Sequence, residues 1–138
     1  MKLIIRVFAV LVLFALAGPA SHAQSLTGAK AQKSAQADGL IAYENALMAG
    51  GLEAARPHMT PDKLDELNGM LKNFGEDGFK QFLERMRGGA RDMARRKQIE
   101  KVEVKGDYAV LEARDSPAVV TVQHFAKTKD GWKVDVRR

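Results

Sequence analysis

From Lys97 to the end of the chain, apolar and polar residues alternate, and this two-residue period limits the possible folds more than any other feature. Successive side chains of a β-strand point to opposite faces, so the alternation predicts strands with one buried face. A Gly-Asp pair at 106–107 and a Lys-Asp-Gly triplet at 129–131 are typical of turns between antiparallel strands. The sequence therefore predicts a four-stranded antiparallel sheet, with strands at residues 99–104, 108–114, 119–126 and 132–136.

Before this region, apolar residues recur every three or four positions, as on the buried face of a helix. A first helix is expected from 35 to 48, ended by Gly50-Gly51, and Thr60-Pro61-Asp62 has the cap, proline and acid that begin a second. Gly75 is expected to end that helix, and Gly88-Gly89 to interrupt a third that continues to about residue 96. Helices followed by an antiparallel sheet predict an α+β fold, with the N-terminal helices packed on a curved, cone-like sheet.

The first 23 residues are predicted to be a secretory signal peptide rather than part of the domain. Lys2 and Arg6 precede an apolar run at 7–17, which is too short for a membrane span, and small residues suit cleavage after Ala23. Residues 24–34 are polar and small and are predicted to be a mobile N-terminus, which leaves 35–138 as a single domain. The expected location is the periplasm or the cell exterior.

Charge and cysteine content narrow the classes of function. The chain carries 22 basic and 17 acidic residues, and the leader holds two of the basic ones and no acid, so the mature net charge would be +3. This small excess is unlike that of a nucleic-acid-binding protein, and any membrane contact is expected to be peripheral. The absence of cysteine excludes disulfides, a thiol nucleophile and a lipid-anchoring cysteine.

Four segments carry a recurring pattern: ALMAGGLEAA at 46–55, MTP at 59–61, VEVKGDYAV at 102–110 and KDGWKV at 129–134. Together they resemble the nuclear-transport-factor-2-like superfamily, in particular its small exported bacterial members. The resemblance implies a cone-shaped sheet over helices, often with an apolar pocket, in proteins that include isomerases, dehydratases, polyketide-cyclase-like enzymes and non-enzymatic modules. Gly51 departs from the aspartate usual in the family, and the missing anchor cysteine implies a soluble version.

A cone of this kind would bring helix and strand residues together around one ligand pocket. Its expected lining is Tyr43, Leu47, Phe82, Tyr108, Val122, His124 and Trp132. By alternation His124 shares a strand face with Val120 and Val122, so we predict that it points inward as the best acid–base candidate. A hydrogen-bonded structural histidine is the alternative, and we favour it. His58 is a second candidate, against the simpler interpretation of an exposed loop residue.

Three further residues invite comparison with ketosteroid isomerase, a superfamily member that pairs an aspartate base with tyrosine and aspartic-acid donors. They are Asp38, Tyr43 and Asp115. Their roles cannot be assigned residue by residue, because the Asp-Ser-Pro loop at 115–117 accounts for Asp115 and helix packing accounts for Tyr43. Histidine spacing shows no metal-site pattern, so no metal or cofactor is expected.

Arg87, Arg91 and Arg95 lie four residues apart and would form a basic ridge along one side of a helix. Such a ridge would dock an acidic surface or lipid head groups, or would simply be a solvated face. Our leading prediction is an exported, non-enzymatic module that binds a small apolar or amphipathic ligand or a protein partner, with dimerisation through the sheet as one arrangement. The alternatives are an isomerase-like or dehydratase-like enzyme using His124, and an interaction protein using the ridge.

Overall fold

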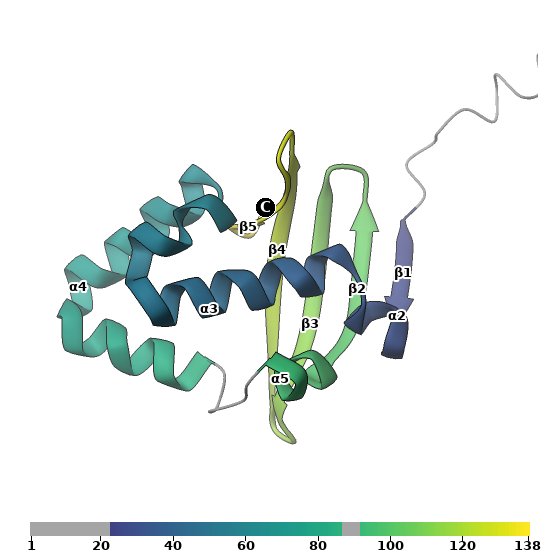
Figure 1. Cartoon of the computed structure of the whole chain (residues 1–138), viewed down its shortest axis with the longest axis horizontal. Coiled ribbons are helices and arrows are strands. Elements are labelled where there is room, and N and C mark those ends of the chain that lie inside the picture. Colours follow the sequence, from purple (N-terminus) through teal and green to yellow (C-terminus); the bar gives the residue numbers. More distant parts are fainter. Residues whose placement is uncertain (1–22, 87–91) are drawn as a thin grey trace, which may run out of the picture.

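The computed structural model describes residues 23–86 and 92–138, which form an open sheet with helices on one face (Figure 1). The sheet has five antiparallel strands in the order β1-β2-β3-β4-β5. Their bounds are β1 (Gln24–Thr27), β2 (Ile99–Lys105), β3 (Tyr108–Ser116), β4 (Val119–Thr128) and β5 (Gly131–Asp135). The predicted α+β class is confirmed, whereas the predicted count of four strands is wrong.

The additional strand, β1, comes from the segment 24–34, for which the sequence predicts a mobile N-terminus. Instead, this segment forms β1 and a short helix, α2 (Gly28–Gln32). Gln24 pairs with Val104 and Thr27 with Lys101, so the partner strand lies more than seventy residues away in sequence. Four residues are too few for an alternating pattern to be recognised, because only Leu26 among them is apolar. The predicted signal peptide lies outside the described residues, apart from Ala23.

The helices break where the sequence predicts. Gly51 has φ of 68° and Gly75 has φ of 74°, values at which glycine alone avoids strain, and each interrupts a helix. The backbone N–H of Lys63 donates to Thr60 Oγ1 at 3.3 Å, as expected of an N-cap. The predicted break at Gly88-Gly89 falls outside the described residues. The remaining helices are α3 (Ala35–Ala55), the 3-10 turn η1 (Arg56–His58), α4 (Pro61–Met86) and α5 (Asp92–Gln98).

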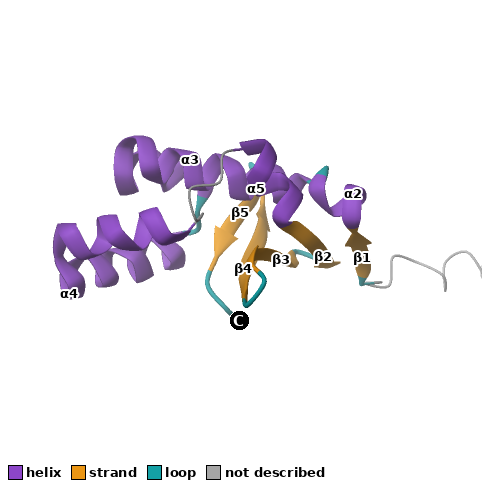
Figure 2. Ribbon diagram, turned by 90° about the horizontal axis from the view of Figure 1, so that it is seen from below, coloured by secondary structure: helices purple, strands orange, loops and turns teal. Residues whose placement is uncertain are grey.

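Helices α2, α3 and α5 cover one face of the sheet, while α4 lies beyond the β5 side (Figure 2). The predicted α3 stripe of Leu40, Tyr43 and Leu47 is at most 2% exposed. Facing it, Phe125 and Val134 of the sheet are fully buried. Burial of this apolar surface contributes the main favourable term to folding. The opposite face of the sheet carries no helix among the described residues.

Candidate functional site

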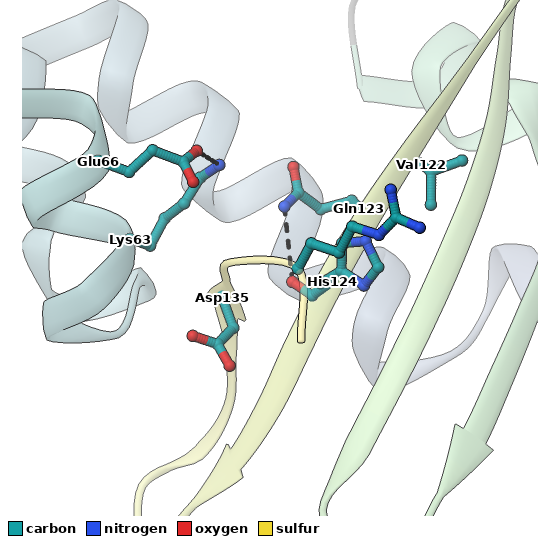
Figure 3. Close-up of a pocket in the computed structure, with 7 residues that line it drawn as sticks. Lys63, Glu66, Val122, Gln123, His124 and Asp135 are labelled. Carbon is teal, nitrogen blue, oxygen red and sulfur yellow. Dashed lines mark hydrogen bonds and ion pairs between the residues drawn. The ribbon is translucent and has the colours of Figure 1, made fainter. Parts of the chain in front are cut away.

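A cleft of about 550 Å³ opens beside the sheet, where β5 ends (Figure 3). Helix α4, strand β4 and the C-terminal segment all contribute side chains to it. Lys63 and Glu66 face each other on α4, across from His124 and Asp135 (Figure 3). The full lining is Lys63, Glu66, Val122, Gln123, His124, Asp135 and Arg137.

The cleft exists because β4 is longer than β5, the last strand of the sheet. β5 pairs with β4 from Thr128 back to His124, where Asp135 is the last partner. The preceding part of β4, Val119–Gln123, has β3 on one side and no strand on the other among the described residues. We call this part the open edge. The far side of β5 is occupied, because the N–H of Thr60 donates to the carbonyl of Val134 at 2.9 Å.

Asp135 is held in place by two donors at the floor of the cleft. Its Oδ1 accepts a hydrogen bond from Thr60 Oγ1 at 2.6 Å, and its Oδ2 accepts one from Arg138 Nε at 2.7 Å. Burial alone would raise the pKa of Asp135, but the hydrogen bonds from Arg138 and Thr60 outweigh burial and hold the pKa below its ordinary value. Asp135 is only 1% exposed, so it is a fixed anion that is already paired.

The remaining charges leave the cleft with one free cation among the described residues. Lys63 Nζ is paired with Glu66 Oε1 at 2.6 Å. Arg137 is exposed and makes no ion pair or hydrogen bond with the part of the chain that the structure describes. Burial lowers the pKa of His124, and the positive charges of Arg137 and Lys63 lower it further. The imidazole therefore stays neutral near neutral pH, in a positive local field.

His124 lies on the sheet face opposite to the core. Its alternation with Val120 and Val122 is as expected, but the residues on the helix-covered face are the intervening ones, such as Phe125. The inward orientation predicted for His124 is therefore wrong. Its Nδ1 shares a hydrogen bond with the hydroxyl of Tyr108, and the two rings stack with centroids 5.7 Å apart. The favoured interpretation of a hydrogen-bonded histidine agrees with this geometry.

The residues predicted to line one pocket are divided by the sheet. Tyr43 and Leu47 are each 1% exposed in the core, and Trp132 packs against that core. Tyr108, Val122 and His124 lie on the other face of the sheet, and only the last two line the cleft. Phe82 belongs to a separate hollow of about 270 Å³ on α4, lined by Met70, Phe74, Gly78, Phe82 and Arg85.

A buried ionic group, the Arg95 cluster, lies between α3, α5 and the sheet. Arg95 Nε donates to Glu44 Oε1 at 2.9 Å, its Nη1 donates to Asp115 Oδ1 at 2.5 Å, and Thr121 Oγ1 donates to Asp115 Oδ2. The side chains of Arg95 and Glu44 are 0% exposed. Burial would lower the pKa of Arg95, but the hydrogen bonds and charges of Glu44 and Asp115 raise it above its ordinary value.

This cluster corrects two predictions. Arg95 is buried, so it cannot belong to an exposed ridge, and the other two ridge residues, Arg87 and Arg91, lie outside the described residues. Asp115 is not in a loop, because β3 extends through Ser116, and its carboxylate pairs with Arg95. One signal was available in the sequence: Glu44 falls within the apolar stripe of α3, where an acid is expected to be buried and paired.

Two other candidates do not join the cleft. His58 is half-buried in η1 and does not line it. Asp38 is exposed and pairs with Arg96 at 2.8 Å. Most of the lining was not predicted, including Lys63, Glu66 and Arg137, because only the end of β5 brings them together.

Within the described residues, no group of three or more metal-ligating side chains is assembled, and no helix is long and apolar enough to cross a bilayer. Comparisons with protein-family models, with curated proteins and with solved structures found no match. The arrangement can therefore be interpreted only from its own chemistry. It offers the guanidinium of Arg137, which has no partner within residues 23–86 and 92–138, together with a neutral imidazole and the apolar side chain of Val122, in an open cleft.

Proposed function

We propose that this protein is an exported, non-enzymatic binding module whose cleft binds the anionic group of an amphipathic ligand. Arg137 would contact the anion, and Val122, which is 49% exposed, would contact the apolar part. Export is supported by the basic, apolar and small-residue pattern of residues 1–23. A ligand could be a small molecule or part of a protein, and nucleic acid is not expected at this net charge.

The observation that carries this proposal is the contrast among the ionic groups of the cleft. Lys63 is neutralised by Glu66, and Asp135 by Arg138. Arg137 alone has no partner among the described residues that line the cleft. A guanidinium presents planar donors that suit carboxylates and phosphates, so an unpaired one in a cleft favours an anionic ligand.

The family prediction fits this proposal without being required by it. Helices followed by an antiparallel meander support the nuclear-transport-factor-2-like superfamily, in which non-enzymatic modules occur. A cone-like curvature of the sheet belongs to the same proposal. Dimerisation through the uncovered sheet face would compete with the ligand for Val122 and His124, which lie on that face.

The proposal can be tested by titrating isotopically labelled protein with three six-carbon probes, namely hexanoate, hexanol and hexylammonium. We expect hexanoate alone to shift the amide signals of Val122, Gln123 and His124. Arg137→Gln should weaken that binding by about tenfold, the loss expected for one charge-assisted hydrogen bond. The matched control is Arg56→Gln, since Arg56 is exposed on η1 and its ion pair within the described part of the chain is with Glu53.

Equal shifts from hexanoate and hexylammonium would contradict recognition of an anion. Hexanoate binding that survives Arg137→Gln unchanged would contradict the role of Arg137. Shifts confined to the hollow around Phe74 on α4 would move the site to that hollow.

A second candidate is acid–base catalysis by His124, favoured by one observation, its contact with Tyr108. If Nδ1 of the neutral imidazole carries the proton and donates it to the Tyr108 oxygen, Nε2 is the acceptor nitrogen and can take a proton from a bound substrate. This alternative requires a ligand whose acidic carbon reaches the free Nε2 of His124. Hydrogen–deuterium exchange of a bound ketone, lost in His124→Gln and retained in His58→Gln, would support it over simple binding.

A further inference from the structure

The backbone of the open edge faces outward at two residues. The N–H of Lys127 donates to the carbonyl of Asp107, the residue just before β3, at 2.8 Å, so the N–H of Lys127 points toward the β3 side. Because backbone direction alternates along a strand, Thr121 and Gln123 also point toward β3, and Val120 and Val122 point away. The β3–β4 register is continuous over this stretch. Val120 and Val122 therefore present N–H and C=O groups along the open edge that have no backbone partner in the part of the chain that the structure describes.

The side chains of the open edge lack the usual protection of an edge strand. Natural edges are commonly blocked by charged residues, especially lysine, or by covering elements. Here no charged residue occurs between Ser116 and Ala126. Val119, Val120 and Val122 are 51%, 42% and 49% exposed. Such an edge is a template for pairing with another extended segment.

The other part of β4 shows how the molecule covers an edge when it has a segment to do so. There, β5 pairs with β4, and the N–H of Thr60 closes the far side of β5. The pairing of β5 with β4 ends at Asp135, beside the cleft. A further strand on the open edge would continue the line of β5, and its first residue would lie at the cleft.

Charge decides what kind of strand fits. The end of the open edge lies beside Arg137, which has no partner among the described residues, so an incoming segment with an acid there would be complementary. A second copy of this chain would not supply one. Neither of its available edges, Gln24–Thr27 of β1 or Val119–Gln123 of β4, contains an acidic residue.

We propose that the open edge of β4 binds an extended peptide segment as an added antiparallel strand, with an acidic residue at its N-terminal end placed against Arg137. The backbone of the segment pairs with Val120 and Val122, and its alternate side chains contact the exposed valines. This inference rests on the proposed function, because it specifies the anionic ligand as a polypeptide.

The test uses a capped hexapeptide of one glutamate followed by alternating threonine and valine, titrated into the full chain after removal of the leader. Two N-methylated forms separate backbone pairing from side-chain contact. In one form the backbone amides of peptide residues 3 and 5 are methylated, and in the other form those of residues 2, 4 and 6. In an added strand only one of these sets faces β4. We expect one form to bind at least about tenfold more weakly than the unmethylated peptide, and the other within about threefold.

Two controls address the acid. Glutamine in place of the glutamate should weaken binding about tenfold, and Arg137→Gln should weaken the glutamate peptide to the same degree without affecting the glutamine peptide. If the two substitutions together weaken binding no more than either one alone, the peptide glutamate and Arg137 contact each other.

Equal effects of the two methylation patterns, or no binding of the peptide at all, would overturn the added strand. A concentration-dependent dimer in which the amides of Val120 and Val122 are protected without peptide would assign the edge to a second copy. In either case, hexanoate binding that depends on Arg137 would leave the proposed function standing. If neither the peptide nor hexanoate binds, both the added strand and the proposed function are contradicted.

Discussion

Two arginines of this chain occupy contrasting surroundings, Arg95 inside the fold and Arg137 in the open cleft. Arg95 is 0% exposed and is paired with Glu44 and Asp115. Arg137 is exposed and has no ionic partner among the described residues. A buried cation must be compensated by fixed anions, whereas an exposed cation in a cleft can remain unpaired because water solvates it.

The difference separates a structural role from a binding role for the same chemical group. Both arginines stand next to another basic residue, in RRK at 95–97 and RR at 137–138, so their local sequences look alike. The neighbours pair with acids elsewhere, Arg96 with Asp38 and Arg138 with Asp135. Partnership in space, rather than charge density in sequence, therefore distinguishes the two roles.

The largest expected effect comes from replacing the two arginines by methionine and comparing the free energies of unfolding. Arg95→Met removes the cation that pairs with the buried carboxylate of Glu44 and the partly buried carboxylate of Asp115, and should cost about 3–5 kcal/mol. Arg137→Met is the matched control and should change stability by less than about 0.5 kcal/mol. Urea unfolding monitored by Trp132 fluorescence measures both. Equal losses in the two variants would break the comparison.

A smaller effect is expected from Thr60→Val, which tests a carboxylate that is buried but also lines the cleft. Loss of the hydroxyl removes a hydrogen bond to Asp135 and the cap of α4, and should cost about 2 kcal/mol. Thr128→Val is a control on the same sheet, since the hydrogen bonds of its hydroxyl to described residues all lie within the β4–β5 turn. A Thr60→Val variant as stable as the wild type would show that Arg138 alone fixes Asp135.

The same variant has a pH signature. Because the pKa of folded Asp135 lies below the ordinary value of 3.8, its contribution to stability is present above that value and is lost as the pH falls toward the folded pKa. Thr60→Val should reduce this acid-dependent loss. A profile of unfolding free energy between about pH 2 and 5 that is identical in both proteins would contradict the assignment.

The smallest expected effect is a change in the pKa of His124. Its folded value should lie below 6.5, since burial and the charges of Arg137 and Lys63 oppose protonation. Arg137→Gln should raise the pKa of His124, because one positive charge is removed, whereas Arg56→Gln should not. Stability linked to His124 is present above the ordinary value of 6.5 and declines as the pH falls below it. Proton NMR titration of the imidazole measures the shift. An unchanged pKa of His124 in Arg137→Gln would show that the charge of Arg137 does not act on the imidazole.

Much of the secondary structure could be predicted from local sequence signals. The apolar stripe of Leu40, Tyr43 and Leu47, the cap at Thr60 and the break at Gly75 all act within one or two helical turns, so their effects are visible in a short window. The turns at 106–107 and 129–130 lie where predicted for the same reason. β1 was missed because its strand character depends on pairing with β2.

The candidate site was mostly beyond sequence reasoning. Val122 and His124 were predicted to line a pocket, and both line the cleft, but they do so on the uncovered side of the sheet. Alternation separates the residues of a strand into two sets without showing which set the helices cover. In β4 both sets contain apolar residues, Val120 and Val122 on one side and Phe125 on the other, so hydrophobicity does not decide between them.

By itself, the sequence determined the helices that begin at residue 35, the four strands that follow residue 98, their turns and the α+β class, because these follow from backbone preferences and periodicities between near neighbours. The tertiary structure decided the fifth strand, the burial of Arg95, the uncovered face that holds His124 and the short β5 that leaves the open edge. Each depends on contacts between residues far apart in sequence, such as Arg95 with Glu44 and Thr60 with Asp135. In the sequence, Arg95, Thr60 and Asp135 each look like ordinary surface residues, and only Glu44, which falls within the apolar stripe of α3, gives a local signal of its buried partner.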